Sequence, residues 1–476
     1  MLVLLVGTGI LMTVLTGFFQ VTHIGHWFSN TLGGIFKNKH ITAHTPGHDR
    51  QISQFQSLCT ALAATIGTGN IAGVAAALAT GGPGAIFWMW IVAFFGMMTN
   101  YSENVLGIYY RRKNSEGEWC GGAMYYLKEG LGGKKGCKEI GAVLAVLFSI
   151  FCVLASFGIG NMSQINSIAV NLNSVFKIPA VATGIVLMGV SSLVIVGGLK
   201  RIANVTEKLV PFMAVLYVIG CIVIVIANIG EIPAAFTAII KGAFGLRAVG
   251  GGIVGSGVSM ALTWGMKRGV FSNEAGLGSS VMVHSASNVR EPVKQGMWGI
   301  FEVFADTIVV CTLTALAVLC SGVMNLETGE MISSAEKTAL VAEAFEGTLG
   351  RFGGWFIAIA ITLFAFSTVL GWSIYGSKAF EYLFGTRAVL VYKMVFVIFI
   401  VFGATMDLTL AWDLSDTFNG LMAMPNLIGV IVLSGTVMKI TRNYVDRKIK
   451  GKDVKPMFSA IPEIQEEQEK RTDDGI

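Results

Sequence analysis

Residues 62–73 read Leu-Ala-Ala-Thr-Ile-Gly-Thr-Gly-Asn-Ile-Ala-Gly, and this stretch decides the fold class. It lies inside an apolar segment, about 54–79, that is long enough to cross a lipid bilayer as a helix. Glycine lowers the steric cost of leaving helical geometry, and Thr65, Thr68 and Asn70 place polar groups among the glycines. Backbone groups freed in this way persist in a membrane only where they line a cavity or bind a ligand. The stretch therefore predicts a helix broken at mid-membrane, with helix packing through small residues as the alternative.

Composition places the whole chain in a membrane. Of the 476 residues, 53% are hydrophobic and 13% are charged, whereas a soluble domain carries about 25% charged residues. The seven cysteines show no C-x-x-C spacing, and five of the six histidines lie in one polar stretch, about 23–48, that we interpret as a solvated loop. The glycines follow G-x-G-x-x-x-G with no preceding strand, which excludes a dinucleotide fingerprint. We expect the lipid bilayer as a partner, and no metal cluster, organic cofactor or nucleic acid.

Hydropathy and charge predict the topology. We expect eleven spans, with the N-terminus outside and the C-terminus in the cytoplasm, because this arrangement places 29 of the 34 Lys and Arg residues in inner segments. One inner segment in this count is 267–294. The predicted spans are 2–19, 54–79, 83–109, 139–170, 179–199, 208–228, 250–271, 295–320, 353–378, 388–406 and 414–438.

The seventh span resembles the second in its glycine content. Gly250, Gly251, Gly252, Gly255 and Gly257 lead into Ser259–Gly265, and we expect this helix to break beside Gly265. The two spans are five apart, and an odd-numbered repeat inverts its own topology, so two inverted five-helix repeats are expected. The predicted division is an extra N-terminal helix (1–19), a cytoplasmic linker (20–53), a first repeat (54–228), an outer loop (229–249), a second repeat (250–438) that includes an outer loop (321–352), and a cytoplasmic tail (439–476).

Four motifs give the chain a family resemblance. They are Ala64–Gly73, Gly81–Gly84, Phe157–Met162 and Arg268–Ser279, of which Ser-Asn-Glu-Ala-Gly at 272–276 is the most specific. These stretches resemble the alanine/glycine:cation symporter family over nearly the whole chain. The resemblance implies an all-α membrane protein with a leucine-transporter-like 5+5 inverted repeat preceded by one extra helix. It also implies import of alanine, glycine or related small amino acids with sodium or protons through the cell membrane.

The resemblance also implies the substrate residues. Backbone N–H groups at a half-helix N-terminus suit a carboxylate, and the family motif puts them at Thr68, Gly69 and Asn70. Gln164 offers an amide to a polar ligand, with an interhelical hydrogen bond as the alternative. The residues expected to close the side-chain pocket are Met260, Thr263 and Trp264.

Sodium is expected between the broken helix and the ninth span. By resemblance its ligands are the carbonyls of Ala63 and Ile66 and the hydroxyls of Ser367 and Thr368. Each of these hydroxyls has an alternative role, a hydrogen bond to its own helix.

Acidic residues inside the predicted spans are a separate matter, because such residues are costly and usually functional. Glu302 and Asp306 stand one turn apart, either to bind a second cation or proton or to hold the fold through a buried donor. Glu103 lies near an inner end, and Glu274 is expected to make a structural or gating contact.

The sequence lacks the patterns of two other classes of membrane protein. A channel shows a repeated filter or pore helix, and an enzyme shows a nucleophile–base pair, but the sequence contains neither pattern, and His284 near the inner surface stands alone. In the outer loop, Ser334–Glu346 predicts an amphipathic surface helix. The acidic stretch Glu463–Glu469 predicts a solvated, disordered end. The sequence leaves the preferred amino acid, the coupling ion and the oligomeric state open.

Overall fold

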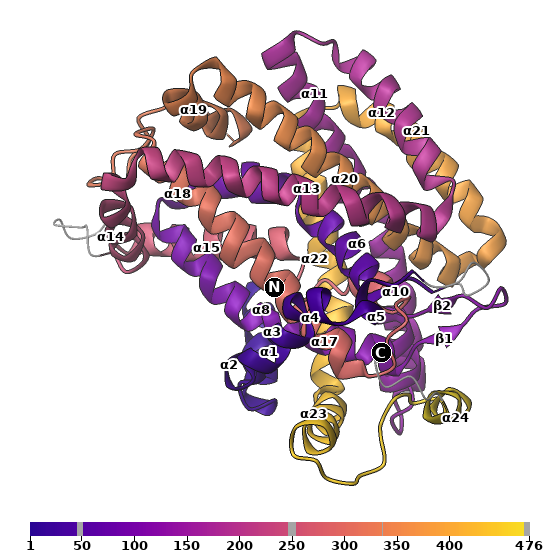
Figure 1. Ribbon diagram of the computed structural model, residues 1–476. Helices are drawn as coiled ribbons and strands as arrows, with labels where there is room; N and C mark the ends of the chain where they lie inside the picture. Colours follow the sequence, from indigo (N-terminus) through magenta and orange to yellow (C-terminus); the bar gives the residue numbers. More distant parts are fainter. Residues whose placement is uncertain (45–50, 246–253, 336, 471–476) are drawn as a thin grey trace.

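The computed structural model describes residues 1–44, 51–245, 254–335 and 337–470. Helices dominate this part of the chain (Figure 1), and its one sheet is a two-stranded hairpin that pairs Arg112 with Cys120 and Lys113 with Trp119. The N-terminal elements are α1 (Leu2–Leu15), α2 (Phe19–Thr22), α3 (Ile24–Asn30), α4 (Leu32–Lys37) and α5 (Lys39–Thr42).

The predicted first repeat holds most of the long helices of the N-terminal half. Its elements are α6 (Gln54–Thr65), η1 (Gly69–Gly73), α7 (Val74–Gly81), α8 (Gly84–Tyr109), β1 (Arg112–Lys113), β2 (Trp119–Cys120), α9 (Ala123–Tyr125), η2 (Tyr126–Leu131), α10 (Lys138–Phe157), η3 (Gly158–Met162), α11 (Ser163–Phe176), α12 (Ala180–Ile195) and α13 (Gly198–Ala227). A short turn η4 (Ile229–Glu231) and helix α14 (Ile232–Ala243) follow it.

The C-terminal half begins after the undescribed residues 246–253. Its elements are α15 (Val254–Asn273), α16 (Val281–His284), α17 (Pro292–Val303), η5 (Phe304–Cys311), α18 (Thr312–Cys320), α19 (Lys337–Leu349), α20 (Arg351–Phe384), η6 (Thr386–Ala388), α21 (Val389–Thr405), α22 (Leu408–Val432), α23 (Ser434–Tyr444), η7 (Val445–Ile449) and α24 (Pro462–Lys470).

The helices have the length and polarity of membrane spans. In the described residues six are long and apolar enough to cross a bilayer, and two bent pairs raise the number to eight. Leu193 on α12 and Phe212 on α13 face outward, whereas Thr60, Asn100 and Glu302 are buried. In a lipid bilayer, polar side chains are expected to face the protein interior and apolar side chains to face the lipid. The count of eleven spans stays a prediction.

The first predicted break is confirmed. Helix α6 starts at a capping box in which the Ser53 hydroxyl and the Gln56 amide each bond the other's backbone, and it ends at Thr65. The chain resumes helical form at Gly69, and the two parts meet at 49°. Residues 66–68 are therefore an unwound segment within a bent span.

The second break lies later than expected. Helix α15 continues through Gly265 to Asn273, and the non-helical segment is 274–280, where Glu274, Gly276 and Gly278 all have positive φ. The expectation of a break beside Gly265 is therefore wrong. Glycine by itself does not open a helix that packs well on both sides, and α15 packs against α8 and α7. Gly250, Gly251 and Gly252 lie outside the described residues.

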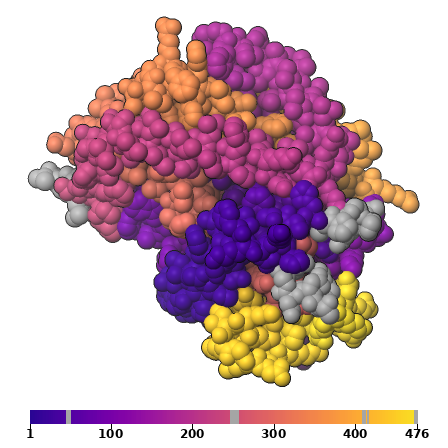
Figure 2. All heavy atoms as spheres, in the orientation of Figure 1, coloured from indigo at the N-terminus to yellow at the C-terminus, as the bar shows by residue number. Residues whose placement is uncertain are grey.

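Three further expectations concern the outer loop, the acidic C-terminal end and His284. The surface helix in the outer loop is present as α19, which buries Leu340 and Phe345. The acidic end is not a disordered tail, because α24 forms there and the preceding residues bond back to the end of α8, as in Ala460 N–H to Tyr109 O at 2.9 Å. His284 is completely buried, and its expected position near the inner surface stays a prediction. Figure 2 shows the C-terminal residues beside the N-terminal ones on one face, where His26 meets the Tyr444 hydroxyl at 3.1 Å.

Candidate functional site

Two side chains from other helices converge on the first break. The Thr68 N–H donates to Oε1 of Gln164 on α11 at 3.3 Å. A Cβ atom at Gly67 would lie 3.3 Å from the same Oε1 and would overlap the Thr368 hydroxyl on α20. Residue 67 is therefore glycine because Gln164 and Thr368 approach its backbone closely from two other helices.

The Thr68 side chain has unused hydrogen-bonding capacity. Its hydroxyl is buried and has no partner in the described structure. A buried polar atom without a partner is rare in native proteins and marks a place where a ligand or water supplies the missing bond. The Gly67 N–H is already taken, since it donates to Asn70 Oδ1 at 2.9 Å.

Asn70 ties the broken helix to two others. Its amide donates to Oδ1 of Asp306 at 2.6 Å, and Oδ2 of Asp306 accepts from Ser272 and Thr307, each at 2.8 Å. The Asp306 carboxylate thus joins η1, α15 and η5. These contacts agree with the fold-holding alternative for Asp306, and they occupy the Asn70 amide.

The four residues expected around sodium also lie together. The Ser367 hydroxyl is 3.3 Å from the Ala63 carbonyl and 2.8 Å from the carbonyl of Phe364 in its own helix. The Thr368 hydroxyl bonds Phe364 O at 3.0 Å and borders Gly67. Ile66 follows the last residue of α6, and its ψ of 89° turns its backbone out of the helix. Both hydroxyls make the helix-internal bond that was the alternative to ion binding, and both also face the end of α6.

The residues expected to close the pocket lie farther along α15 toward its start. A Cβ at Gly69 would lie 3.2 Å from both the Phe271 ring and the Ser272 Cα, so these two residues back the broken helix. Met260 and Thr263 are exposed, and Trp264 is half-buried beside Gly81. Sequence reasoning missed Phe271, although it directly precedes the stretch 272–276 that carries the strongest motif.

Trp264 instead borders a cavity that runs alongside η1 and α7. The cavity measures about 350 Å³ and is lined by Thr80, Lys337, Arg268 and Asp416, among others. Arg268 lies over the Trp264 ring at 5.2 Å, and Lys267 pairs with Asp416 at 2.6 Å. Lys267 and Arg268 therefore share a side of the protein with Thr80 and Lys337, which were assigned to the outer side. Their assignment to an inner segment therefore disagrees with the outer assignment of Lys337, and 27 of the 34 basic residues would remain in the predicted inner segments without them.

Comparison with known proteins agrees with this geometry. The family model described as "Sodium:alanine symporter family" matches residues 1–460. The chain belongs to this family. The symporter is 46% identical to the sodium/alanine symporter AgcS of Methanococcus maripaludis, over 93% of this chain and 94% of that protein. It is 37% identical to the probable sodium/glutamine symporter GlnT of Bacillus subtilis, over 86% and 81% of the two chains.

A solved structure shares the fold. MhsT in complex with L-phenylalanine covers 83% of this symporter and 99% of its own chain, with a TM-score of 0.53 and 14% sequence identity. The symporter therefore has the leucine-transporter-like fold and is a multi-pass membrane transporter rather than an enzyme.

Proposed function

We propose that this protein imports small neutral amino acids, alanine or glycine, together with sodium by alternating access. The observation that carries the proposal is the meeting of the unwound residues 66–68, Gln164 and Thr368 around an unpartnered Thr68 hydroxyl. The substrate carboxylate would bind at the N-terminal end of η1, through Thr68, Gly69 and Asn70, because backbone N–H groups and the helix dipole favour an anion there.

Close packing around the break favours a small side chain. Gly69 is backed by Phe271, and a Cβ at Gly160 in η3 would overlap the Trp372 ring. These two close approaches around the break support a substrate with a small side chain. Glutamine is the alternative substrate, since GlnT carries that name, and it requires the neighbouring rings to move.

Sodium would bind at the opposite end of the same unwound segment. The carbonyls of Ala63 and Ile66 and the hydroxyls of Ser367 and Thr368 supply neutral oxygens, which suit a monovalent hard cation. Binding there orders the segment that also receives the substrate, so the two ligands favour each other.

Uptake by proteoliposomes tests the function. Alanine accumulation is measured with an inward sodium gradient, with a pH gradient alone, and with both, and glycine, alanine and glutamine compete for entry. We expect sodium-driven accumulation of alanine that glycine inhibits more strongly than glutamine does. Accumulation that needs only the pH gradient would show that protons, and not sodium, are the coupling ion. Stronger inhibition by glutamine than by glycine would show that glutamine is the preferred substrate.

A further inference from the structure

A cluster of acidic side chains is buried in the interior of the protein. Glu103, Glu274, Glu302 and Asp306 are each at most 2% exposed and come from four different segments. Among the described residues no Lys or Arg forms an ion pair with any of them, and the one basic partner is His284, whose Nε2 lies 3.0 Å from Glu302. A buried carboxylate without a positive partner is costly, by several kcal/mol after relaxation.

Two of the four acids are fully satisfied as hydrogen-bond acceptors. Asp306 accepts from Asn70, Ser272 and Thr307. Glu103 accepts from the Asn426 amide. Glu302 differs: its Oε2 accepts from His284 and from Asn100 at 3.3 Å, whereas its Oε1 has no partner.

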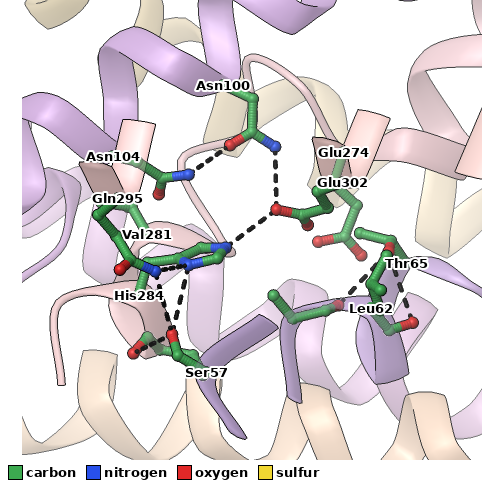
Figure 3. Close-up of polar contacts among 12 residues, drawn as sticks. Ser57, Leu62, Thr65, Asn100, Asn104, Glu274, Val281, His284, Gln295 and Glu302 are labelled. Atoms are coloured by element: carbon green, nitrogen blue, oxygen red, sulfur yellow. Dashed lines mark hydrogen bonds and ion pairs between the residues drawn. The ribbon is translucent and has the colours of Figure 1, made fainter. Parts of the chain in front are cut away.

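Glu274 adds a second carboxylate at the same place. It is the first residue of the second unwound segment and accepts from Trp372 Nε1 at 2.7 Å and from the Ser279 hydroxyl at 2.6 Å. Figure 3 shows the Glu274 and Glu302 side chains next to each other, between His284 and Thr65. The two carboxylates interact electrostatically, and the buried Tyr375 hydroxyl, which interacts with both, also lacks a partner.

His284 contacts only one carboxylate of this pair. The Gln295 amide nitrogen contacts His284 Nδ1, and His284 Nε2 lies 3.0 Å from Oε2 of Glu302. The other titratable groups that face the pair are Glu103 on α8, Asp306 on η5, Tyr375 on α20 and Cys152 on α10, and none of them carries positive charge.

We propose that Glu274 and Glu302 share one proton in the conformation described here and form a proton-binding site, built from carboxylates that are not among the proposed sodium or substrate ligands. Two like charges in one dry site repel each other, and one shared proton removes that repulsion. When the transporter opens and water enters, hydration stabilises both carboxylates and the proton leaves to water. Because Glu274 lies in the unwound segment and bonds Trp372, the proton couples to the same helices that move during transport.

Infrared spectroscopy of the purified protein tests the site without any substrate. A protonated carboxyl group has a C=O stretch separate from the carboxylate and amide bands. We expect this band in the wild-type protein at neutral pH, and we expect its loss in Glu302→Gln and in Glu274→Gln, because either change leaves a single carboxylate with its hydrogen-bond donors. Glu103→Gln is the matched control, a buried acid on α8, and should retain the band. Absence of the band from the wild type would overturn the proposal, as would a band that only Glu103→Gln removes.

A second measurement links the proton to ligand binding and rests on the proposed function. Alanine and sodium are added to the protein in weakly buffered detergent solution that contains a pH indicator. Only the molecules that are open before the ligands are added can bind a proton on closure, so the wild type should take up a measurable fraction of one proton per molecule and Glu302→Gln should take up none. Equal proton uptake by both proteins would contradict the site while leaving sodium-driven alanine transport intact. Failure of the wild type to bind alanine would contradict the proposed function, and the infrared result would still decide the site.

Discussion

At the scale of single residues, the contacts of the Thr368 hydroxyl allow two roles, a sodium ligand or a hydrogen-bond donor within its own helix. It bonds Phe364 O in its own helix and borders Gly67 at the break. Thr368→Val keeps the branched shape and removes the oxygen, so the sodium concentration for half-maximal alanine uptake should rise. Removing sodium from the wild type should weaken apparent alanine affinity about 5- to 150-fold, the range for a coupling of about 1–3 kcal/mol.

Thr362→Val is the matched control for this substitution. Thr362 lies on the same helix and bonds Ala358 O at 2.8 Å, as a helix-internal hydroxyl does. Its removal should leave sodium dependence unchanged. Equal sodium dependence of Thr368→Val and the wild type would show that the Thr368 hydroxyl bonds only its own helix and does not bind sodium.

Gln164 carries the second prediction at this scale. Its Oε1 accepts from the Thr68 N–H and its Nε2 donates to Ile159 O at 3.0 Å. Gln164→Ala should weaken alanine binding by about 1.5–3 kcal/mol, roughly 10- to 150-fold, because a hydrogen bond to a charged ligand is lost. Equilibrium binding of labelled alanine to the purified, monodisperse variant measures this loss.

Gln164→Glu identifies the end of the substrate that lies beside residue 164. A carboxylate at this position repels the substrate carboxylate and attracts its ammonium group. We expect Gln164→Glu to bind alanine as poorly as Gln164→Ala does. Binding at wild-type strength by the Glu variant would place the ammonium group at Gln164 instead.

At the scale of the elements, the C-terminal segment acts as a clamp on the loop before α17. Arg447 on η7 forms a bidentate ion pair with Glu291 at 2.7 and 2.9 Å, and Glu291 is almost fully buried. Arg447 also lies 5.6 Å from the centre of the Phe458 ring, which Arg290 approaches at 4.8 Å. The tail is therefore part of the folded structure.

Arg447→Met tests the clamp. It leaves Glu291 buried without its charged partner, and breaking a buried pair in this way costs about 3–5 kcal/mol. The midpoint of thermal unfolding in detergent should fall clearly below that of the wild type. Arg442→Met, an exposed position in the preceding helix, should unfold like the wild type. Equal midpoints for the two variants would show that the ion pair contributes nothing measurable.

At the scale of the whole molecule, a native cysteine reports the orientation. Cys137 is half-buried in the segment before α10, and the other six cysteines are buried. The predicted topology puts Cys137 in the cytoplasm. A membrane-impermeant maleimide should therefore label inside-out vesicles and leave intact cells unlabelled.

Cys137→Ser serves as the control and should remove the signal from inside-out vesicles. Labelling of Cys137 in intact cells would reverse the predicted orientation. Without Lys267 and Arg268, the basic excess remains on the predicted inner side.

The sequence by itself determined that the chain crosses a membrane, that the helix at Gly67 breaks, and that Gln164, Ser367 and Thr368 belong with that break. Hydropathy and glycine content are local properties of the chain, and they indicate the spans and the break. The family motifs indicate which distant residues belong with the break. Only the tertiary structure decided that the second break lies at 274–280, since α15 stays helical where neighbouring helices support it. Only the tertiary structure also shows that Glu302 lies beside Glu274 and His284 and that Arg447 forms an ion pair with Glu291. Such pairings depend on which distant segments pack together around buried polar groups, and no local pattern specifies that packing.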